Sequence, residues 1–294
     1  MKVAIYGQYY QNSTEPIIRD IFSFFNKNNV EMVIESEFLK MLYEKGIVQK
    51  SYNTFESYKE LDNSFDMLIS IGGDGTILRA ATLVRNTGVP ILGINAGRLG
   101  FLAMVQKENI EVFLQFVINK EYTISPRTLL SLKSYPENPD IENINFAMNE
   151  ISVSRKDTTS MITIDTYLDG EFLNSYWADG LIIATPTGST GYSMSCGGPI
   201  LTPDVQSLVI TPIAPHNLNA RPLVIPDKTE IRLKVSGREE QYLVSLDSRI
   251  ASIKNESVLV IRKTPFKINM VEIPGETFLK TLRNKLLWGE DKRN

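Results

Sequence analysis

The sequence predicts an α/β fold with a mostly parallel sheet in its N-terminal part and an all-β, sandwich-like domain in its C-terminal part. Three observations lead to this prediction. The chain has 294 residues, more than one hydrophobic core comfortably serves. Strand-like and helix-like stretches alternate as far as about residue 125, which is typical of βαβ units. From Tyr122 onward, short alternating runs punctuated by Gly, Pro and Asp dominate, which is typical of antiparallel sheets.

In the N-terminal part, the apolar run Lys2–Tyr6 predicts a strand that ends at Gly7. Thr14 is a suitable cap for a following helix, in which apolar residues recur every three or four positions from Ile17 to Phe25. The other elements expected in this part are strands at Glu31–Ile34, 66–71 and Pro90–Ile94, and helices at Phe38–Leu42, 76–87 and Asn109–Ile118.

In the C-terminal part, Asp169-Gly170 between two strand-like runs is a strong two-residue hairpin signal. The polar segment Tyr135–Asn143 is expected to be a hairpin tip or loop, and Glu276–Trp288 is expected to be a terminal helix. Strands are expected at Met161–Leu168, Leu181–Ala184, Leu208–Ile210, Ile231–Val235 and Val258–Ile261. The predicted domains are 1–124 (α/β), 125–273 (all-β) and 274–294, a helix that packs on the first domain.

Composition narrows the possible functions. The net charge of −3 gives no basic field for nucleic acid. The single cysteine, Cys196, excludes a disulfide framework, and the single histidine, His216, argues against multi-histidine zinc sites and His-based triads. His216 is interpreted as a loop residue, with a place in a site as the alternative. No apolar run approaches the ~20 residues that span a bilayer, and no signal peptide is recognised, so a cytoplasmic location is expected.

Residues 66–79, DMLISIGGDGTILR, read as a strand, a glycine turn and a helix, with one carboxylate in the turn. Glycines at such a turn let backbone N–H groups approach a phosphate closely, and the helix N-terminus favours negative charge. Asp74 would repel bare phosphate. If the turn binds a nucleotide, Asp74 must therefore face a hydroxyl or a metal ion, which points to group transfer.

A second group of polar residues follows strands of the C-terminal part. Leu181–Ala184 runs into the segment Thr185–Ser193, TPTGSTGYS, which is dense in hydroxyls and glycine. Asn149-Glu150 begins another strand, and Asp179-Gly180 precedes the apolar one. Each motif alone is as well or better explained as ordinary turn or strand-end chemistry. Their joint occurrence in one chain favours a nucleotide site, although neither a Walker A sequence nor a complete GxGxxG fingerprint is found.

These motifs resemble the NAD kinases, over most of the chain. The resemblance is carried by Gly72–Thr76, Asn95–Leu102, Asn149-Glu150, Asp179-Gly180, Thr185–Ser193, Gly197–Ile200 and the segment from Pro212 to Pro222. The GGDGT turn alone is shared with lipid kinases, and a GGDG turn with phosphofructokinases. Two departures are Asp247-Ser248-Arg249, where many members have Asp-Gly, and Gly191, where Ala is common.

The resemblance implies transfer of the γ-phosphoryl group of ATP, or of polyphosphate in some members, to the 2′-hydroxyl of the adenosine ribose of NAD, giving NADP. It implies a divalent metal, usually Mg²⁺, and a homodimer or homotetramer. Small molecules are the expected partners, with no nucleic acid and no membrane. The family architecture is an α/β domain followed by an all-β domain, with the chain end returning to the first.

The resemblance also implies roles for individual residues. Asp74 orients the acceptor hydroxyl and takes its proton late, because a ribose hydroxyl is far too weak an acid for a free aspartate to ionise beforehand. The expected ligand-binding residues are Gly73, Gly75 and Thr76 for phosphate, Arg79 for the donor or as a solvated helix residue, Asn149 and Glu150 for the adenosine or ribose groups, Asp179 for the nicotinamide end, and Thr190, Gly191, Tyr192 and Ser193 around the adenine. No protein ligand to the metal is assigned.

Three rival functions share some of these motifs. A lipid or diacylglycerol kinase has the GGDGT turn, and a kinase of the phosphofructokinase type has a GGDG turn. A non-catalytic NAD-binding module would keep the second group of motifs. The combination of Asn149-Glu150 with Thr185–Ser193 favours NAD kinase over the first two, and Asp74 argues against the third.

Overall fold

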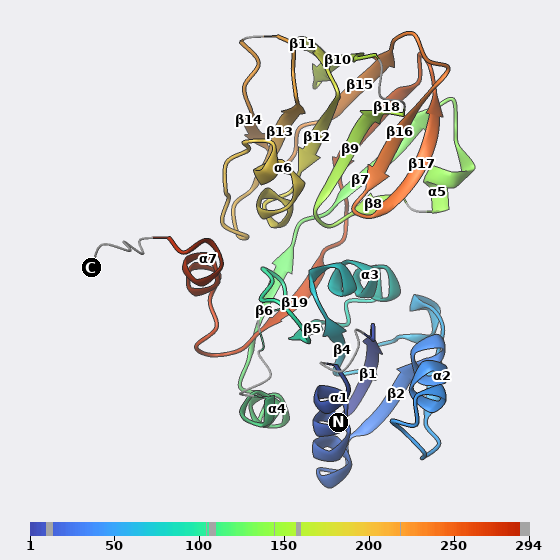
Figure 1. Ribbon diagram of the computed structural model, residues 1–294, viewed down its shortest axis with the longest axis vertical. Helices are drawn as coiled ribbons and strands as arrows, with labels where there is room; N and C mark the ends of the chain where they lie inside the picture. The colour runs from blue at the N-terminus through green and yellow to red at the C-terminus, as the bar shows by residue number, and fades with distance from the viewer. Residues whose placement is uncertain are drawn as a thin grey trace. The chain divides into compact units, whose positions relative to one another are not determined.

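The computed structural model describes residues 1–9, 14–103, 105, 110–143, 145–156, 160–217 and 219–288. The chain divides into two compact units. The first comprises Met1–Pro126 together with Ile268–Asn294, and the second comprises Arg127–Lys267. Figure 1 labels the elements of both units.

The first unit is built on a seven-stranded sheet in the order β3-β2-β1-β4-β5-β19-β6. Its strands are β1 (Lys2–Gly7), β2 (Glu31–Glu35), β3 (Asn53–Phe55), β4 (Met67–Gly72), β5 (Ile91–Asn95), β6 (Thr123–Arg127) and β19 (Ile268–Glu272). The pairs from β3 through to β5 are parallel, and β19 joins β5 in parallel. The carboxyl ends of these parallel strands therefore share one edge, where ligands usually bind.

Helices accompany this sheet. They are α1 (Thr14–Lys27), α2 (Ser36–Glu44), the short 3₁₀ helix η1 (Tyr58–Glu60), α3 (Asp74–Val84), α4 (Ile110–Ile118) and α7 (Phe278–Leu286). The apolar positions of α1, among them Ile18, Ile21 and Phe25, are fully buried in the core with β1 and β4. The Glu35 side chain caps α2 by accepting a hydrogen bond of 2.7 Å from the Phe38 N–H.

Two elements of the first unit differ from the sequence-based expectation. Helix α3 begins at Asp74 and not at residue 76, because aspartate is favourable in a first helical turn and the flanking glycines permit the sharp entry. Residues 268–272, which lie within the range 125–273 predicted for the all-β domain, form β19 in the first sheet. Helix α4 is as expected from Ile110 onward, and Asn109 lies outside the described residues.

The second unit contains two antiparallel six-stranded sheets, β11-β10-β15-β18-β7-β8 and β14-β13-β12-β9-β16-β17. The strands of the first sheet are β7 (Leu130–Tyr135), β8 (Phe146–Ala147), β10 (Ile162–Leu168), β11 (Glu171–Ala178), β15 (Ile231–Ser236) and β18 (Val258–Lys263). Those of the second are β9 (Glu150–Arg155), β12 (Gly180–Ala184), β13 (Ser207–Ile213), β14 (Leu223–Pro226), β16 (Gln241–Leu246) and β17 (Arg249–Lys254). Short helices α5 (Pro139–Asn143), η3 (Thr187–Thr190) and α6 (Tyr192–Ser195) complete the unit.

The two sheets share one hydrophobic core, to which Ile164 and Leu233 contribute from one sheet and Val153 and Leu181 from the other. Strands such as β10 and β16 alternate buried positions with more exposed ones, as a sandwich requires, whereas β12 is buried along its whole length. The Asp169-Gly170 hairpin turn forms as expected, with positive φ at both residues.

The polar segment Tyr135–Asn143, which was expected to be a hairpin tip or loop, contains the helical turn α5, whose Ile141 is buried in the core.

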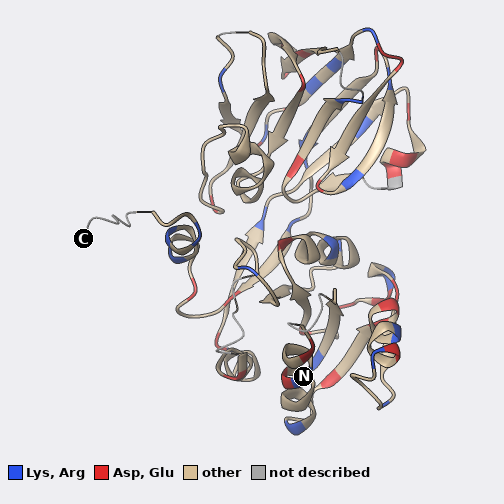
Figure 2. Ribbon diagram, in the orientation of Figure 1, with Lys and Arg blue, Asp and Glu red and all other residues tan. Residues whose placement is uncertain are grey.

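His216 packs against the Trp177 ring at a centroid distance of 4.5 Å, and its backbone N–H donates to the Trp177 carbonyl. These contacts give His216 a structural role in its loop, in agreement with the first of its two interpretations. Acidic and basic residues both occur in each unit (Figure 2).

Candidate active site

Asp74 is held by the backbone of a neighbouring loop in the first unit. Its Oδ2 accepts a hydrogen bond from the Phe101 N–H at 2.8 Å, and its Oδ1 accepts from the N–H groups of Leu102 at 3.0 Å and Ala103 at 3.1 Å. A carboxylate offers about four lone-pair positions. Among the described residues, one position on Oδ2 is therefore left open. The charge of Asp74 is stabilised by these donors and by the N-terminus of α3, while one oxygen remains available to a ligand.

Two glycines make this close arrangement possible. A Cβ atom at Gly100 would lie 1.9 Å from Asp74 Oδ1, and one at Gly72 would lie 2.2 Å from Thr76 Oγ1. Neither distance is compatible with a side chain. The loop can reach the carboxylate, and the turn can close on the helix, only because these positions have no Cβ.

Thr76 closes the glycine turn itself. Its Oγ1 accepts a hydrogen bond from the Gly73 N–H at 3.3 Å and donates to Gln8 Oε1 at 3.2 Å. Its side chain is fully buried, so it supports the turn from within. Gly75 and Arg79 are exposed on the first turns of α3, and within the described part of the chain the Arg79 guanidinium has no ion-pair partner. These two residues are free to approach a phosphate group.

In the second unit, Asp247 anchors the segment that carries Asn149 and Glu150. Asp247 Oδ1 accepts hydrogen bonds from the N–H groups of Asn149 at 2.7 Å and Glu150 at 3.2 Å, and Oδ2 accepts from the Met148 N–H at 3.0 Å. Arg249 Nη2 lies 3.4 Å from Oδ2. The departure from the family pattern at residues 247–249 thus keeps an aspartate with a defined structural role, and it adds an arginine.

The hydroxyl-rich turn sits directly on the same segment. The Thr185 N–H donates to the Asn149 carbonyl at 2.9 Å, and Thr185 Oγ1 donates to the Met148 carbonyl at 2.6 Å. A Cβ atom at Gly188 would lie 2.0 Å from the Asn149 carbonyl oxygen. The two motifs that the sequence separates by 35 residues are therefore built into one structure.

This structure contains buried polar atoms that lack partners. Asn149 Oδ1, Glu150 Oε2 and Thr187 Oγ1 are each buried and make no hydrogen bond with any described residue. A buried polar atom without a partner costs roughly 1–3 kcal/mol, so its presence in a native structure calls for an explanation. A ligand that brings hydroxyl, amino or ring-nitrogen groups would satisfy all three.

Glu150 has an unusual proton affinity. Burial raises the pKa of Glu150 to about 8, and repulsion from the nearby Asp247 carboxylate adds to this effect, while the Tyr192 backbone N–H opposes it. Burial also raises the pKa of Asp247, although the Met148 and Asn149 N–H groups and Arg249 act in the opposite direction. Near neutral pH, Glu150 is therefore mainly a neutral acid that can donate one hydrogen bond as well as accept others.

Two further predicted residues lie close to this group. Asp179 Oδ2 forms an ion pair with Arg155 Nη2 at 3.0 Å, and both side chains are partly exposed. Tyr192 is 46% exposed; burial raises the pKa of its phenol, and the charges of Cys196, Asp179 and Glu150 raise it further. Asp179 and Glu150 therefore lie close enough to Tyr192 for their charges to affect its pKa.

Two more of the residues expected around the adenine, Thr190 and Ser193, use their hydroxyl groups within the protein. Ser193 is fully buried, and its hydroxyl lies 2.8 Å from that of Thr211. Thr190 Oγ1 donates to the Thr187 carbonyl at 3.2 Å, within the turn of η3. These hydroxyl groups stabilise the turn, so any contact of Ser193 with a ligand would have to use its backbone.

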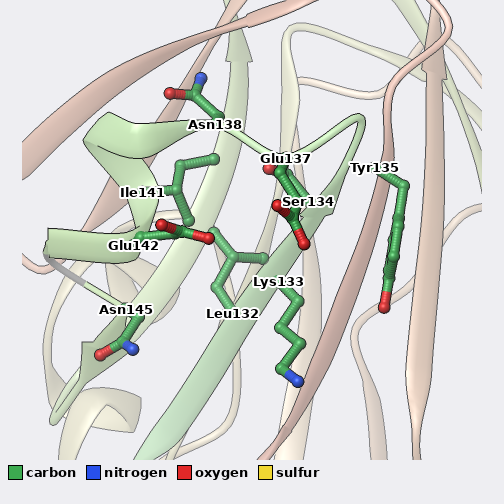
Figure 3. Close-up of a pocket in the computed structure, with 9 residues that line it drawn as sticks. All are labelled: Leu132, Lys133, Ser134, Tyr135, Glu137, Asn138, Ile141, Glu142 and Asn145. Atoms are coloured by element: carbon green, nitrogen blue, oxygen red, sulfur yellow. The ribbon is translucent and has the colours of Figure 1, made fainter.

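A separate cavity of about 260 Å³ lies beside β7 and α5 (Figure 3). It is lined by Leu132, Ile141 and neighbouring polar side chains, and none of the predicted site residues contributes to it.

Within the described ranges, no group of three or more His, Cys, Asp or Glu side chains could hold a metal ion. None of the described helices is long and apolar enough to cross a membrane.

Comparison with known proteins defines the class. The family pattern of the ATP-NAD kinase N-terminal domain matches residues 3–122, and that of the ATP-NAD kinase C-terminal domain matches residues 148–273. The molecule is thus a phosphotransferase that acts on an alcohol group. The chain belongs to the NAD kinase family.

Individual relatives agree with this assignment. The chain is 78% identical to an NAD kinase of Flavobacterium johnsoniae and 74% identical to one of Flavobacterium psychrophilum, in each case over the full length of both chains. It is also similar to the solved structure of an Archaeoglobus fulgidus NAD kinase in complex with ATP, with a TM-score of 0.73, 26% identity and 97% of each chain covered. Yeast NADH kinase complexed with NADH shares the fold, with a TM-score of 0.87, 24% identity, and 99% of this chain and 88% of that chain covered.

These findings confirm the predicted fold class, family and kind of enzyme. They do not support the lipid kinase or the non-catalytic NAD-binding module. Sequence reasoning missed three contributions to the candidate site, namely the amides of residues 101–103, the anchor Asp247 and the Arg155 partner of Asp179.

Proposed function

We propose that this protein transfers the γ-phosphoryl group of ATP to the 2′-hydroxyl of the adenosine ribose of NAD, giving NADP and ADP. Membership of the NAD kinase family supports the reaction, and the observation that carries its mechanism is the Asp74 carboxylate, which three backbone amides hold with one position on Oδ2 open. An acceptor hydroxyl is the group that such a position suits, because it can donate a hydrogen bond to a carboxylate.

In this mechanism, the 2′-hydroxyl donates to Asp74 Oδ2 and its oxygen points at the γ-phosphorus. The new O–P bond forms while the bond from the γ-phosphorus to the leaving oxygen of ADP breaks, and the proton passes to Oδ2 late in the step. Late transfer fits a carboxylate whose charge is already stabilised by amides. Asp74 then acts mainly by orienting the hydroxyl and accepting the proton once the oxygen has become acidic.

The donor phosphates are assigned to the start of α3. The exposed Gly75 backbone and the Arg79 guanidinium offer N–H groups and positive charge, while Gly73, whose N–H is bound by Thr76 Oγ1, keeps the turn closed. Mg²⁺ is proposed to accompany ATP through the phosphate oxygens, where it would neutralise charge. The start of α3 fits that arrangement because its exposed N–H groups and the Arg79 guanidinium would hold the same phosphate oxygens that bind Mg²⁺, while the open Asp74 position stays with the acceptor hydroxyl.

NAD binding is assigned to the second unit. The unpartnered Asn149 Oδ1, Glu150 Oε2 and Thr187 Oγ1 are proposed to bind hydroxyl and amino groups of the adenosine part. The neutral acid of Glu150 would donate to a ring nitrogen or hydroxyl oxygen without placing a second full charge beside Asp247. Asp179, already oriented by Arg155, is proposed for the nicotinamide end, with Tyr192, Gly191 and Thr190 near the adenine. A cytoplasmic location and a homodimer or homotetramer remain part of the proposal.

The test is the formation of NADP from NAD, ATP and Mg²⁺, measured with a coupled NADP-specific dehydrogenase. We expect NADP to form in proportion to enzyme and to depend on ATP. Replacing ATP by polyphosphate, and NAD by NADH, defines the donor and the acceptor in the same assay. A preparation that binds NAD by calorimetry yet forms no NADP with either donor would contradict the proposed reaction.

A further inference from the structure

The C-terminal helix α7 contacts the loop that holds Asp74. The Phe278 ring, at the start of α7, lies 6.2 Å from the Phe101 ring between centroids. At the other end of α7, Lys285 Nζ donates to the Leu99 carbonyl at 2.8 Å and lies 5.0 Å from the centroid of the same Phe101 ring. Phe278 and Lys285, which are seven positions apart on α7, thus both contact the five-residue loop from Leu99 to Ala103.

The Leu99–Ala103 loop that α7 contacts also holds Asp74, the proposed proton acceptor. Phe101 supplies both the ring that α7 contacts and the N–H that binds Asp74 Oδ2. Leu102 and Ala103, the next two residues, supply the donors to Oδ1. Phe101 and Ala103 are buried, so the backbone of this segment follows the position of its side chains.

The helix itself is amphipathic in a way that suits this role. Leu282 and Thr281 are buried, whereas Leu279 is 57% exposed. Lys285 is exposed and could extend into water, yet its ammonium group lies on a backbone carbonyl and an aromatic ring. Figure 2 shows the basic residues on this helix, which include Arg283 and Lys285 in its last turn.

We propose that α7 is a positioning element for phosphoryl transfer, in which Phe278 and Lys285 fix the Leu99–Ala103 loop and thereby the direction of the open Asp74 oxygen. The proposal rests on the proposed role of Asp74 as proton acceptor. Phe278 and Lys285 are positioning residues, because they act through the loop. Their effect should be on the rate of transfer and not on NAD binding, since displacement of a catalytic group by about 1 Å can cost up to roughly 100-fold in rate.

The experiment compares Phe278→Ala and Lys285→Met with two control variants on the same helix. Leu279→Ala removes an exposed apolar side chain, and Lys280→Met removes an ammonium group that bonds to Glu276 and the Gly275 carbonyl, away from the loop. For each variant, kcat and the KM for NAD and for ATP are measured, with kcat referred to the fraction of protein that binds NAD by calorimetry. Lys285→Arg and Phe278→Tyr serve as rescue variants, because they keep the cation and the ring.

We expect kcat to fall about 10-fold in Phe278→Ala and about threefold in Lys285→Met, with the KM for NAD within twofold of wild type. The rescue and control variants should keep kcat within twofold. An unchanged kcat in both test variants, an equal loss in the controls, or a rise in KM at constant kcat would overturn the proposal. Lys285 is exposed, so its variant keeps the test valid if Phe278→Ala folds poorly. Near wild-type activity of Asp74→Asn would instead overturn the role of Asp74 itself.

Discussion

Asp74 in the first unit and Asp247 in the second are held in nearly the same way. Each carboxylate accepts hydrogen bonds from three consecutive backbone N–H groups, two on Oδ1 and one on Oδ2. They differ at the remaining Oδ2 position. Arg249 approaches this position in Asp247, whereas in Asp74 it is open among the described residues. The same set of three amide donors therefore holds a structural anchor where a cation fills the last position, and it holds the proposed proton acceptor where that position is open.

Their surroundings reinforce this difference. The Asp247 side chain is only 3% exposed and stands beside Glu150, whose pKa is raised to about 8. Asp74 is half-buried at the N-terminus of α3, where the helix favours its charge. The comparison teaches that two carboxylates with the same number of amide donors can differ in whether a ligand can reach them. In the proposed mechanism, the open lone-pair position of Asp74 is what allows it to accept a proton.

Among variants that keep both aspartates, Gly100→Ala is expected to have the largest effect. The new Cβ would lie 1.9 Å from Asp74 Oδ1, so the loop must withdraw from the carboxylate. We expect kcat to fall by about 100-fold, because the geometry of the proton acceptor is lost. Steady-state kinetics measure the change, with Gly97→Ala, where a Cβ meets no atom within 4 Å, as the control. A kcat within threefold of wild type would show that the amide cradle is not needed for catalysis.

Asp247→Asn tests the anchor. An amide presents an NH₂ group to one of the three N–H donors and leaves Arg249 without its charged partner. We expect the free energy of unfolding to fall by about 2–4 kcal/mol. Urea denaturation measures this, with the exposed Asp20→Asn as the control variant, for which a change below about 0.5 kcal/mol is expected. A loss of kcat without a loss of stability would reverse the roles assigned to the two aspartates.

Glu150→Gln tests how the carboxyl group of Glu150, beside Asp247, makes the stability of the protein depend on pH. The folded-state pKa of about 8 lies above the ordinary value of 4.5, so the folded protein binds more protons than the unfolded chain between these values. Wild-type stability therefore falls across this window as pH rises, whereas glutamine does not titrate. We expect the variant to gain stability relative to wild type from pH 5 to pH 8.5, by up to roughly 4 kcal/mol at the upper end.

The measurement for Glu150→Gln is the free energy of unfolding of both proteins at several pH values. Glu171→Gln, at an exposed position of β11, is the control and should show a difference that does not vary with pH. A constant difference between Glu150→Gln and wild type would mean that Glu150 is ionised in the folded protein at neutral pH.

Gly191→Ala is expected to have the smallest effect. Its Cβ would lie 3.1 Å from Glu150 Oε2, 3.2 Å from the Gly188 carbonyl oxygen and 3.6 Å from Asn149 Nδ2, so the neighbours must move by a few tenths of an ångström. The backbone φ of −96° lies outside the left-handed region that requires glycine. We expect the KM for NAD to change less than about threefold. A change above tenfold, measured by steady-state kinetics, would show that Gly191 sets the shape of the NAD site.

Part of the site could be predicted from the sequence, because two of its motifs directly follow apolar runs. The turn at Gly72–Thr76 follows the run that forms β4, and the segment Thr185–Ser193 follows the run that forms β12. The amides of Phe101–Ala103 could not be predicted, since any residue supplies a backbone N–H and side-chain identity does not reveal it. The place of β19 in the first sheet could not be predicted either, because a short apolar run looks alike in parallel and antiparallel sheets.

Asp247 illustrates a different limit. The sequence pattern identifies a turn with an unusual Asp-Ser-Arg sequence, but only the fold shows that this turn meets the backbone of Met148 and Asn149 about 100 residues earlier. For Ser193, in contrast, the sequence motif suggested a role that the structure does not give to its side chain. Its motif suggests a ligand contact, while the structure pairs its hydroxyl with Thr211 inside the protein.

The most direct test of the account is the Asp74→Asn variant, assayed for NADP formation and for NAD binding by calorimetry. Asparagine keeps the shape of the side chain but cannot take a proton from the acceptor hydroxyl. We predict that kcat falls by about 1,000-fold or more while the dissociation constant of NAD stays within about threefold and the free energy of unfolding changes by less than in Asp247→Asn. Turnover near the wild-type rate would contradict the assignment of Asp74 as the proton acceptor.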